Sequence, residues 1–213
     1  MKKPEPFITH FPSPIKKNEL SEEEKIRKIE GHFHQIMETL GLDLSDPSLM
    51  QTPARVAKMY VKEIFSGLSP DDFPRISFFP HSDKKSGSNM IFIKASFTSF
   101  CEHHFVPFHG RAFVAYLPTD KIIGLSKISR IIRHFSKRPQ VQERMTAQIA
   151  DSLSLLLETE NIAVSLVATH YCVIARGVED DHGHTITNFL HGRFHEDPYL
   201  RQEFFSAVSA TNN

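Results

Sequence analysis

The chain has 213 residues, 40% of them hydrophobic and 23% charged, which is enough for one domain with a buried core and an appended element. Lys+Arg and Asp+Glu balance at 25 each, so the sequence lacks the positive excess of proteins that bind nucleic acids or membrane surfaces. No apolar run reaches the length of a membrane span, and prolines interrupt the N-terminal segment where a signal peptide needs an apolar core. We therefore expect a cytoplasmic protein with no membrane or nucleic-acid partner, in which any anion site is local.

The first part of the chain is predicted to be helical. Residues 1–20 contain several prolines and lysines and are expected to form a flexible arm, mobile or docked on a partner subunit. Ser21 and Glu24 then match a capping box, and apolar residues follow at helical spacing. A second helix is predicted over 52–66, because a Thr-Pro pair supplies a cap and a proline at the first helical position. These features predict an N-terminal helical region over 21–70.

The rest of the chain, 71–213, is predicted to be one domain of strands and helices. Its elements are expected in this order: a loop with one short strand over 71–88, strands at 90–97 and 111–118, helices at 126–137 and 141–158, and a strand at 161–177. Alternate residues of the last strand share one face, which is apolar at four positions and then carries His170, Cys172, Ile174 and Arg176. A packed core seldom ends in this way, so we expect a site there.

A metal site is one interpretation of the two cysteines. In a reducing compartment Cys101 and Cys172 are not expected to form a stabilising disulfide, which leaves metal ligation, catalysis or plain burial. Cys101 and His104 are close enough for one turn to direct both at an ion, and Cys172 comes from a distant strand. Two thiolates and an imidazole suit zinc, and three ligands leave the fourth tetrahedral position for water. The alternative is a buried free cysteine beside surface histidines.

Two further histidines lie next to these residues in the sequence. His103 and His170 are expected to move protons near neutral pH, where imidazole titrates, or else to serve only as hydrogen-bonded neighbours of the metal ligands.

Positive residues near a predicted helix start indicate a phosphate site. Ser126 lies at the start of the helix over 126–137, with Lys127 and Arg130 one turn apart on one face. Arg55 and Lys58 repeat this pattern more weakly. A solvated basic face explains the same residues equally well.

Two other charged residues are candidates for binding a nucleotide. Arg176 is predicted to lie on the metal-bearing face of its strand, so that several phosphates would account for this number of cations. Glu143 begins a predicted helix, where a carboxylate is favourable without any ligand. A buried carboxylate can also accept two hydrogen bonds from the N–H edge of a guanine, and spacing does not choose between these two interpretations.

The sequence resembles the GTP cyclohydrolase I family. The resemblance covers nearly all of the chain after the N-terminal arm and is carried by four segments in the family's order: LSDPSLMQTPARVAKMYVKEIFSGL, SFCEHHFVPFHGRAFVAYLP, IGLSKISRIIRHFSKRPQVQERMT and ATHYCVIARGV. It implies hydrolytic opening of the imidazole ring of GTP at C8, loss of formate, and closure to 7,8-dihydroneopterin triphosphate, the first step toward folate and other pterins.

The resemblance also implies roles for individual residues. The implied zinc ligands, for one ion per subunit, are Cys101, His104 and Cys172; the proton-transfer residues are His103 and His170; the guanine-binding residue is Glu143; the ribose and triphosphate contacts are Ser126, Lys127, Arg130 and Arg176, with Arg55 and Lys58 supplied across a subunit boundary. Zinc then activates water for attack at C8, and we expect His170 to protonate N7 and His103 to serve later steps.

The fold implied by the resemblance is the tunnelling fold, of class α+β. It has an antiparallel sheet with two long helices packed on one side, here over 71–213 as the catalytic domain, preceded by the helical part over 21–70 and the arm over 1–20. Subunits of the family join their sheets into a barrel and two rings stack, which implies a homodecamer with active sites between subunits.

The sequence departs from the family after ARGV, where a run rich in Ser and Thr is replaced by EDDHGHTITNFLHGRF. Glu179, Asp180 and Asp181 would repel a triphosphate if they faced it, whereas a charge run more often points to solvent. His182 and His184 fit a polar loop better than a metal site.

Two other functions remain open at this point. One is a paralogue with the same fold and other chemistry, such as the nitrile reductase of queuosine synthesis, which uses a cysteine nucleophile and NADPH and leaves the Cys-x-x-His pair unexplained. The other is a non-catalytic regulatory subunit that keeps zinc for stability, although such a site would not require His103, His170 and Glu143.

Overall fold

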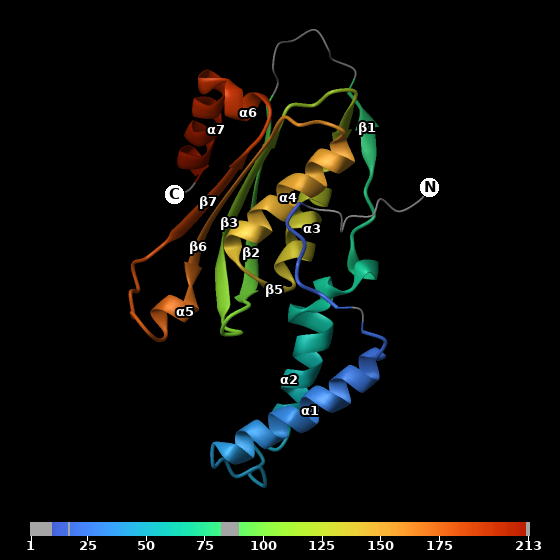
Figure 1. Cartoon of the computed structure of the whole chain (residues 1–213), viewed down its shortest axis with the longest axis vertical. Coiled ribbons are helices and arrows are strands. Elements are labelled where there is room, and N and C mark those ends of the chain that lie inside the picture. Colours follow the sequence, from blue (N-terminus) through green and yellow to red (C-terminus); the bar gives the residue numbers. More distant parts are fainter. Residues whose placement is uncertain (1–9, 17, 82–89, 212–213) are drawn as a thin grey trace.

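The computed structural model describes residues 10–16, 18–81 and 90–211 (Figure 1). The helices are α1 (Glu22–Thr39), α2 (Thr52–Met59), α3 (Leu125–Ser136), α4 (Gln142–Leu157), α5 (Tyr171–Ile174), α6 (Arg193–Glu196) and α7 (Pro198–Thr211), with a π-helical turn at Tyr60–Ile64 and 3-10 turns at Ser66–Leu68 and Pro70–Asp72. The strands are β1 (Phe78–Pro80), β2 (Ile91–Cys101), β3 (Pro107–Tyr116), β4 (Lys121–Ile123), β5 (Pro139–Gln140), β6 (Ile162–His170) and β7 (Thr185–Leu190). Among these residues, no helix is long and apolar enough to cross a bilayer.

The helices α1 and α2 pack against each other and project from the rest of the chain (Figure 1). The predicted capping box is confirmed: the Ser21 hydroxyl accepts a hydrogen bond from the Glu24 amide, and the Glu24 carboxylate accepts one from the Ser21 amide. The second helix begins at Thr52 as predicted, but it changes to a π-helical turn at Tyr60. The division of the chain at residue 70 stays a prediction.

The predicted antiparallel sheet is confirmed for its long strands. The strand order is β5-β2-β3-β6-β7, and all neighbouring pairs are antiparallel except the short parallel pair of β2 and β5. The register places Ile91 opposite Tyr116 at one end of the sheet and Phe100 opposite Pro107 at the other. At this second end, Phe108 of β3 pairs with His170 of β6. Cys101, which follows Phe100, and His170 therefore lie at the same end of the sheet.

Helices cover both faces of the sheet. The long helices α3 and α4 cover one face, where Ala112, Val114 and Tyr116 of β3 enter the larger core. The alternate residues Phe113 and Ala115 enter a smaller core on the opposite face, beneath α6 and α7. The predicted pair of long helices on one side is confirmed, and α6 with α7 is an element that the sequence pattern did not indicate.

The prediction of one strand over 161–177 is wrong beyond His170. The chain leaves the sheet there and forms the single helical turn α5. Cys172 and Arg176 therefore do not continue the strand face on which they were placed, although the turn keeps Cys172 at this end of the sheet. An alternation pattern does not exclude a short helical turn, because four residues are too few to establish either period.

Residues 10–16 lie against α4 of the same chain. The amide of His10 donates to the Asp151 carboxylate at 2.9 Å, and the side chain of Gln148 donates to the carbonyl of Phe11 at 2.9 Å. This part of the predicted arm is thus held by side chains of α4. Residues 1–9 and 17, which the same prediction covers, lie outside the described residues.

A buried arginine connects this segment to the N-terminal helical region. Arg138, 2% exposed, donates from Nε to the carbonyl of Gly67 at 2.7 Å and from a terminal nitrogen to His134 Nε2 at 2.6 Å. Its other terminal nitrogen lies 3.4 Å from Ser13 Oγ. Because Arg138 is always a donor, His134 must accept and is held neutral.

The buried His134 predicts a loss of stability in acid. Burial, and then the charge of Arg138, lower the pKa of His134 to about 3, while a hydrogen bond with the Asp72 backbone acts in the opposite direction. A lowered pKa means that the unfolded state binds the proton first, so stability is complete above pH 6.5 and falls as the pH drops toward 3. We expect His134 to account for a loss of several kcal/mol across this window, on the order of 1.4 kcal/mol per pH unit.

Denaturant titrations between pH 7 and pH 4 measure this loss. The variant His134→Gln keeps a hydrogen-bond acceptor but cannot titrate, so its unfolding free energy should fall less steeply with acid. The exposed His32→Gln variant is the matched control and should keep the steep dependence. Equal slopes for His134→Gln and the unaltered protein would contradict this assignment.

Candidate metal centre and active site

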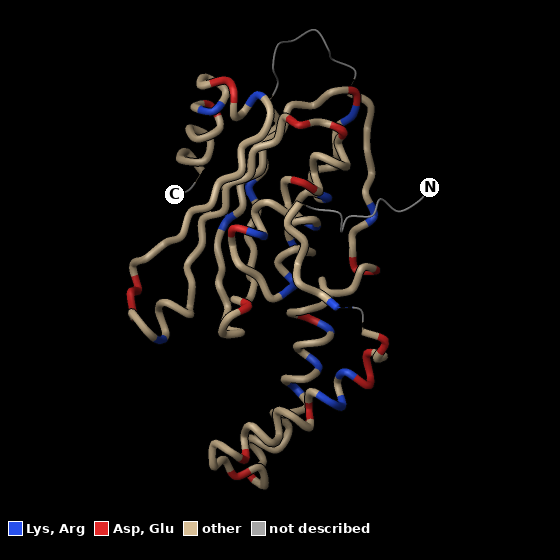
Figure 2. The backbone as a smooth tube through the Cα atoms, in the orientation of Figure 1, with Lys and Arg blue, Asp and Glu red and all other residues tan. Residues whose placement is uncertain are grey.

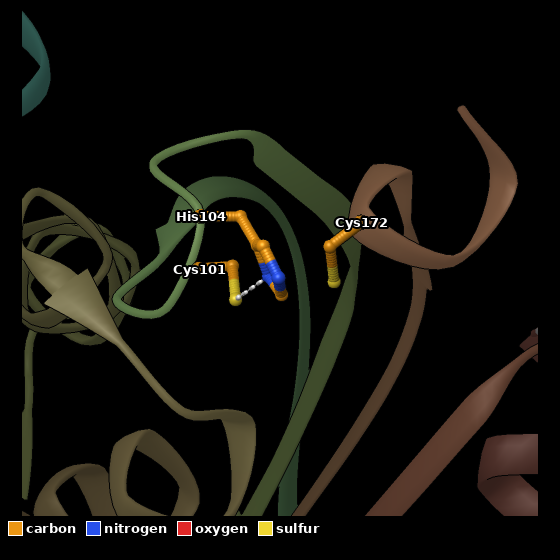
Figure 3. A group of neighbouring side chains, drawn as sticks. All are labelled: Cys101, His104 and Cys172. Atoms are coloured by element: carbon orange, nitrogen blue, oxygen red, sulfur yellow. Dashed lines mark hydrogen bonds between the residues drawn. The ribbon is translucent and has the colours of Figure 1, made fainter. Parts of the chain in front are cut away.

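The sulfur atoms and an imidazole nitrogen of Cys101, His104 and Cys172 all lie within 4.8 Å of one another (Figure 3). Cys101 ends β2, His104 belongs to the turn that follows, and Cys172 lies on α5. The Cys101 sulfur is 3.9 Å from His104 Nδ1. Ligands of a tetrahedral zinc ion are separated by about 3.5 to 3.8 Å, so these donors fit zinc after small side-chain movements.

The turn that holds Cys101 and His104 is closed by the backbone. The Cys101 amide donates to the carbonyl of Val106 at 2.9 Å, and the Phe105 amide donates to the carbonyl of Cys101 at 2.8 Å. Phe105 has a φ of 55°, which is unfavourable for a bulky residue. Its ring packs against Phe65 with centroids 5.4 Å apart, so a contact with the N-terminal helical region supports the strained turn.

A carboxylate and an arginine fix the same turn to α4. The guanidinium of Arg144 donates to both oxygens of Glu102, at 2.5 and 3.2 Å, and both side chains are about one fifth exposed. Glu102 also lies 3.9 Å from His103 Nε2, and His103 Nδ1 is 3.8 Å from the Cys101 sulfur. The sequence analysis missed Glu102 and Arg144, whose importance depends on a contact between distant segments.

The second predicted proton-transfer residue is held by two contacts. The ring of His170 stacks on Phe108, with centroids 4.5 Å apart and planes within 5°, and its Nε2 is 2.7 Å from the side-chain oxygen of Gln142. Burial lowers the pKa of His170, and the charge of Glu143 acts in the opposite direction. The imidazole of His170 is therefore neutral at neutral pH.

Glu143 and Arg176 also lie at this end of the sheet. Glu143 is exposed in the first turn of α4, so the buried carboxylate considered from the sequence is not found in the isolated chain. Arg176 donates to His104 Nε2 at 2.8 Å, which places a positive charge beside the possible metal ligands.

The predicted phosphate contacts Arg55 and Lys58 belong to α2 in the N-terminal helical region. Arg55 and Lys58 are exposed on α2, and the next residues form the π-helical turn whose Tyr60 ring is 6.4 Å from that of Phe105. Elsewhere Lys and Arg are interspersed with Asp and Glu over all parts of the described chain (Figure 2). The assignment of Arg55 and Lys58 to phosphate binding stays a prediction.

Ser126, Lys127 and Arg130 are not brought to this end of the sheet. The amide of Ile123 is 3.3 Å from the hydroxyl of Tyr116, so α3 begins near the far end of β3. Its 12 residues cover about 18 Å before the chain returns to pair Pro139 with Phe100. Ser126 and Lys127, in the first turn of α3, are therefore separated from the Cys101 end of the sheet by most of the length of α3, and Arg130, at the middle of the helix, by about half of it.

The acidic segment faces solvent. Glu179, Asp180 and Asp181 are exposed, and Asp180 accepts a hydrogen bond from the amide of His182 at 3.1 Å. His184 pairs with the hydroxyl of Thr169 at 2.9 Å. This placement agrees with the expected polar loop.

The cysteine thiols predict a pH dependence of metal binding. Burial and the neighbouring Cys101 raise the pKa of the Cys172 thiol, while Arg176 acts in the opposite direction. Because a metal binds the thiolate, zinc must displace this proton. We expect zinc affinity to rise about tenfold per pH unit for each proton displaced, measured by competition with a chelator from pH 6.5 to 8.5. An affinity that does not change over this range would contradict ligation by Cys172.

Comparison with known proteins identifies the family of this chain. A sequence model described as GTP cyclohydrolase I matches residues 29–209. The curated GTP cyclohydrolase 1 of Aeromonas salmonicida (strain A449) is 51% identical over 197 residues, covering 92% of this chain and 89% of the relative. That of Enterobacter sp. (strain 638) is 52% identical over 196 residues, covering 92% and 87%.

Among solved structures, the apo form of the archaeosine synthase QueF-Like matches with a TM-score of 0.40 and 12% identity, over 49% of this chain and 95% of that chain. This likeness is too weak to bear on the chemistry. The family match spans most of the chain, and the sequence relatives cover it almost completely. The chain therefore belongs to the GTP cyclohydrolase I family.

Proposed function

We propose that this protein is a GTP cyclohydrolase I, which opens the imidazole ring of GTP at C8 by hydrolysis, releases formate and forms 7,8-dihydroneopterin triphosphate as the first step of tetrahydrofolate and pterin synthesis. Family membership supports this activity. The observation that supports a location for this activity is that the possible ligand atoms of Cys101, His104 and Cys172 lie within 4.8 Å of one another. The proposed location is the cytoplasm.

Zinc is the proposed cofactor, with one ion per subunit. Two sulfurs and one imidazole nitrogen are donors that suit zinc, and three protein ligands leave one position open, as in catalytic sites. Bound zinc would supply a Lewis acid that lowers the pKa of water toward neutrality. Cys101 is buried, whereas His104 is exposed, so the group is open to solvent on one side.

His170 and His103 are the proposed proton carriers. His170 is held against Phe108, and burial lowers its pKa, so its neutral imidazole first takes up a proton from water. It then passes this proton to N7 of the guanine, which makes C8 electrophilic. His103 is exposed next to Glu102 and is assigned to the later steps at the formyl group or ribose.

Binding of GTP is assigned to charged residues around this group. Glu143 would accept two hydrogen bonds from the guanine edge, and Arg176 lies close enough to His104 to hold a phosphate nearby. Arg55 and Lys58 are the proposed further phosphate contacts. These residues position the substrate and take no part in bond breaking.

The remaining contacts require a second copy of the chain. Ser126 and Lys127 lie in the first turn of α3, most of a helix length from the Cys101 end of the sheet, and Arg130 lies about half a helix length from it. This separation supports active sites shared between subunits of a homo-oligomer, which we propose to be a decamer as in the family.

A comparison of nucleotides tests this function. The zinc-loaded protein should convert GTP to a product with pterin absorbance and leave ATP unchanged, because adenine lacks the N–H edge that Glu143 would bind. Substitution of Glu143 by glutamine should raise KM for GTP and leave zinc content unchanged. No pterin product from GTP would favour the non-catalytic regulatory subunit.

A further inference from the structure

The side chain of Gln142 is the most completely hydrogen-bonded group next to the proposed proton carrier His170. Gln142 is the first residue of α4 and is 1% exposed. Its side-chain nitrogen lies 3.1 Å from the carbonyl of Leu166, 3.0 Å from the carbonyl of Thr185 and 3.1 Å from the hydroxyl of Thr187. Its side-chain oxygen lies 2.7 Å from His170 Nε2.

These partners determine which way the amide of Gln142 points. The carbonyl oxygens of Leu166 and Thr185 only accept hydrogen bonds, so the group that faces them must be the NH2. The reverse orientation would place the amide oxygen against these two carbonyl oxygens without a proton between them, which costs free energy. The side-chain oxygen of Gln142 therefore faces His170, and it can only accept.

The orientation of the amide in turn determines the tautomer of His170. An amide oxygen pairs with Nε2 only when Nε2 carries a proton. In a neutral imidazole the other nitrogen, Nδ1, is then unprotonated. Stacking on Phe108 fixes the plane of the ring. A flip of the ring by 180° within this plane would place a carbon opposite the Gln142 oxygen, so it would lose the hydrogen bond of Nε2.

The strands that supply these partners are fixed as well. Thr187 of β7 bonds to Thr146 of α4 at 2.6 Å, and Thr146 also donates to the carbonyl of Gln142 at 2.8 Å. Leu166 and Thr187 are opposite each other in the β6–β7 register. The amide of Gln142 thus lies in a hydrogen-bond network between a helix and two strands, which holds its orientation.

We propose that Gln142 is a positioning residue for the reaction: it holds His170 in the tautomer protonated at Nε2, so that protons pass to and from the substrate at Nδ1. The inference rests on the proposed role of His170 as the proton carrier. Beyond that role, it identifies Nδ1 as the reacting nitrogen of His170 and Gln142 as the residue that selects it. The spacing of the sequence motifs indicates neither.

Nuclear magnetic resonance of the full-length protein labelled with 15N-histidine tests the tautomer without any turnover. The His170 signals are those that disappear in His170→Asn. At about pH 8.5, where imidazole is neutral, Nε2 should have the shift of a protonated nitrogen and Nδ1 that of an unprotonated one. The opposite pattern in the unaltered protein would overturn the proposal, and this result needs no substitution at Gln142.

Variants of Gln142 test its positioning role. Gln142→Met keeps the length of the side chain and removes the acceptor, so the His170 signals should shift toward a mixture of tautomers. We expect kcat to fall about 10- to 100-fold, with little change in KM and with zinc retained. Thr187→Val removes one partner of the amide nitrogen and leaves the acceptor in place, so it should keep both the tautomer and most of kcat.

The outcomes separate this inference from the proposed function. An unchanged tautomer in a folded Gln142→Met protein would overturn the role of Gln142, even if activity falls. The predicted tautomer in a protein that releases no formate from GTP would refute the proposed function, and with it the assignment of a reacting nitrogen. The predicted tautomer together with the selective loss of kcat would support both.

Discussion

Replacement of Cys172 by alanine is expected to remove both zinc and activity. Cys172 is one of three donors within 4.8 Å, and two remaining donors hold zinc poorly. Turnover of GTP should fall by at least about 10³-fold, because the reaction loses the metal that activates water. Zinc content is measured by metal analysis of the purified protein, and activity by formate release.

Replacement of His170 by alanine should give a different result. Its Nε2 contacts Gln142 and its ring contacts Phe108, so it is not needed to hold the metal. We expect zinc to be retained and turnover to fall about 10²- to 10⁴-fold, the usual contribution of a proton-transfer group. Val173→Ala, in the same short helix as Cys172, is the matched control and should keep zinc and activity. Loss of zinc from His170→Ala would contradict this division of roles.

Mixed oligomers are expected to recover activity that neither parent has. Cys172→Ala damages the metal end of its own subunit, and Lys127→Ala damages the α3 end, meaning the first turn of α3, which lies about 14 Å along the helix from its last residue. If each site uses the metal end of one chain and the α3 end of another, an equal random mixture leaves about one quarter of the sites intact. Formate release by separated mixed oligomers, compared with each parent, measures this recovery.

A control mixture and one contradicting outcome complete this experiment. Subunits that carry both substitutions, mixed with Cys172→Ala subunits, share a damaged metal end and should stay inactive. Mixed oligomers of the two single variants that also stay inactive, although properly assembled, would show that the two ends do not combine into one site. The proposed placement of active sites between subunits would then be wrong.

The local part of the site could be predicted from the sequence. Cys101 and His104 are separated by a single turn, so their spacing is sufficient to bring them together. The long helices and the strands over 90–97, 111–118 and the first part of 161–177 were also predicted, because each has a clear apolar period. Cys172 was found for a partly wrong reason, since it lies on a helical turn and not on the predicted strand.

The rest of the site depends on tertiary contacts that have no local pattern. Glu102 and Arg144 meet across 42 residues of sequence, and Gln142 meets His170 across 28. The position of α3 relative to the metal end follows from the strand register and from β4, which spacing alone does not give. The packing of α6 and α7 on the second face of the sheet likewise depends on Phe113 and Ala115, whose direction is fixed only once the register is known.

The central claim is that this chain opens GTP at C8 with a metal held by Cys101, His104 and Cys172. The most direct measurement is formate released from GTP by the purified zinc-loaded protein, before and after treatment with a chelator and after zinc is restored. We predict one formate per pterin product, loss of both after chelation, and recovery with zinc. A protein that holds zinc at these three residues and releases no formate from GTP would contradict the claim.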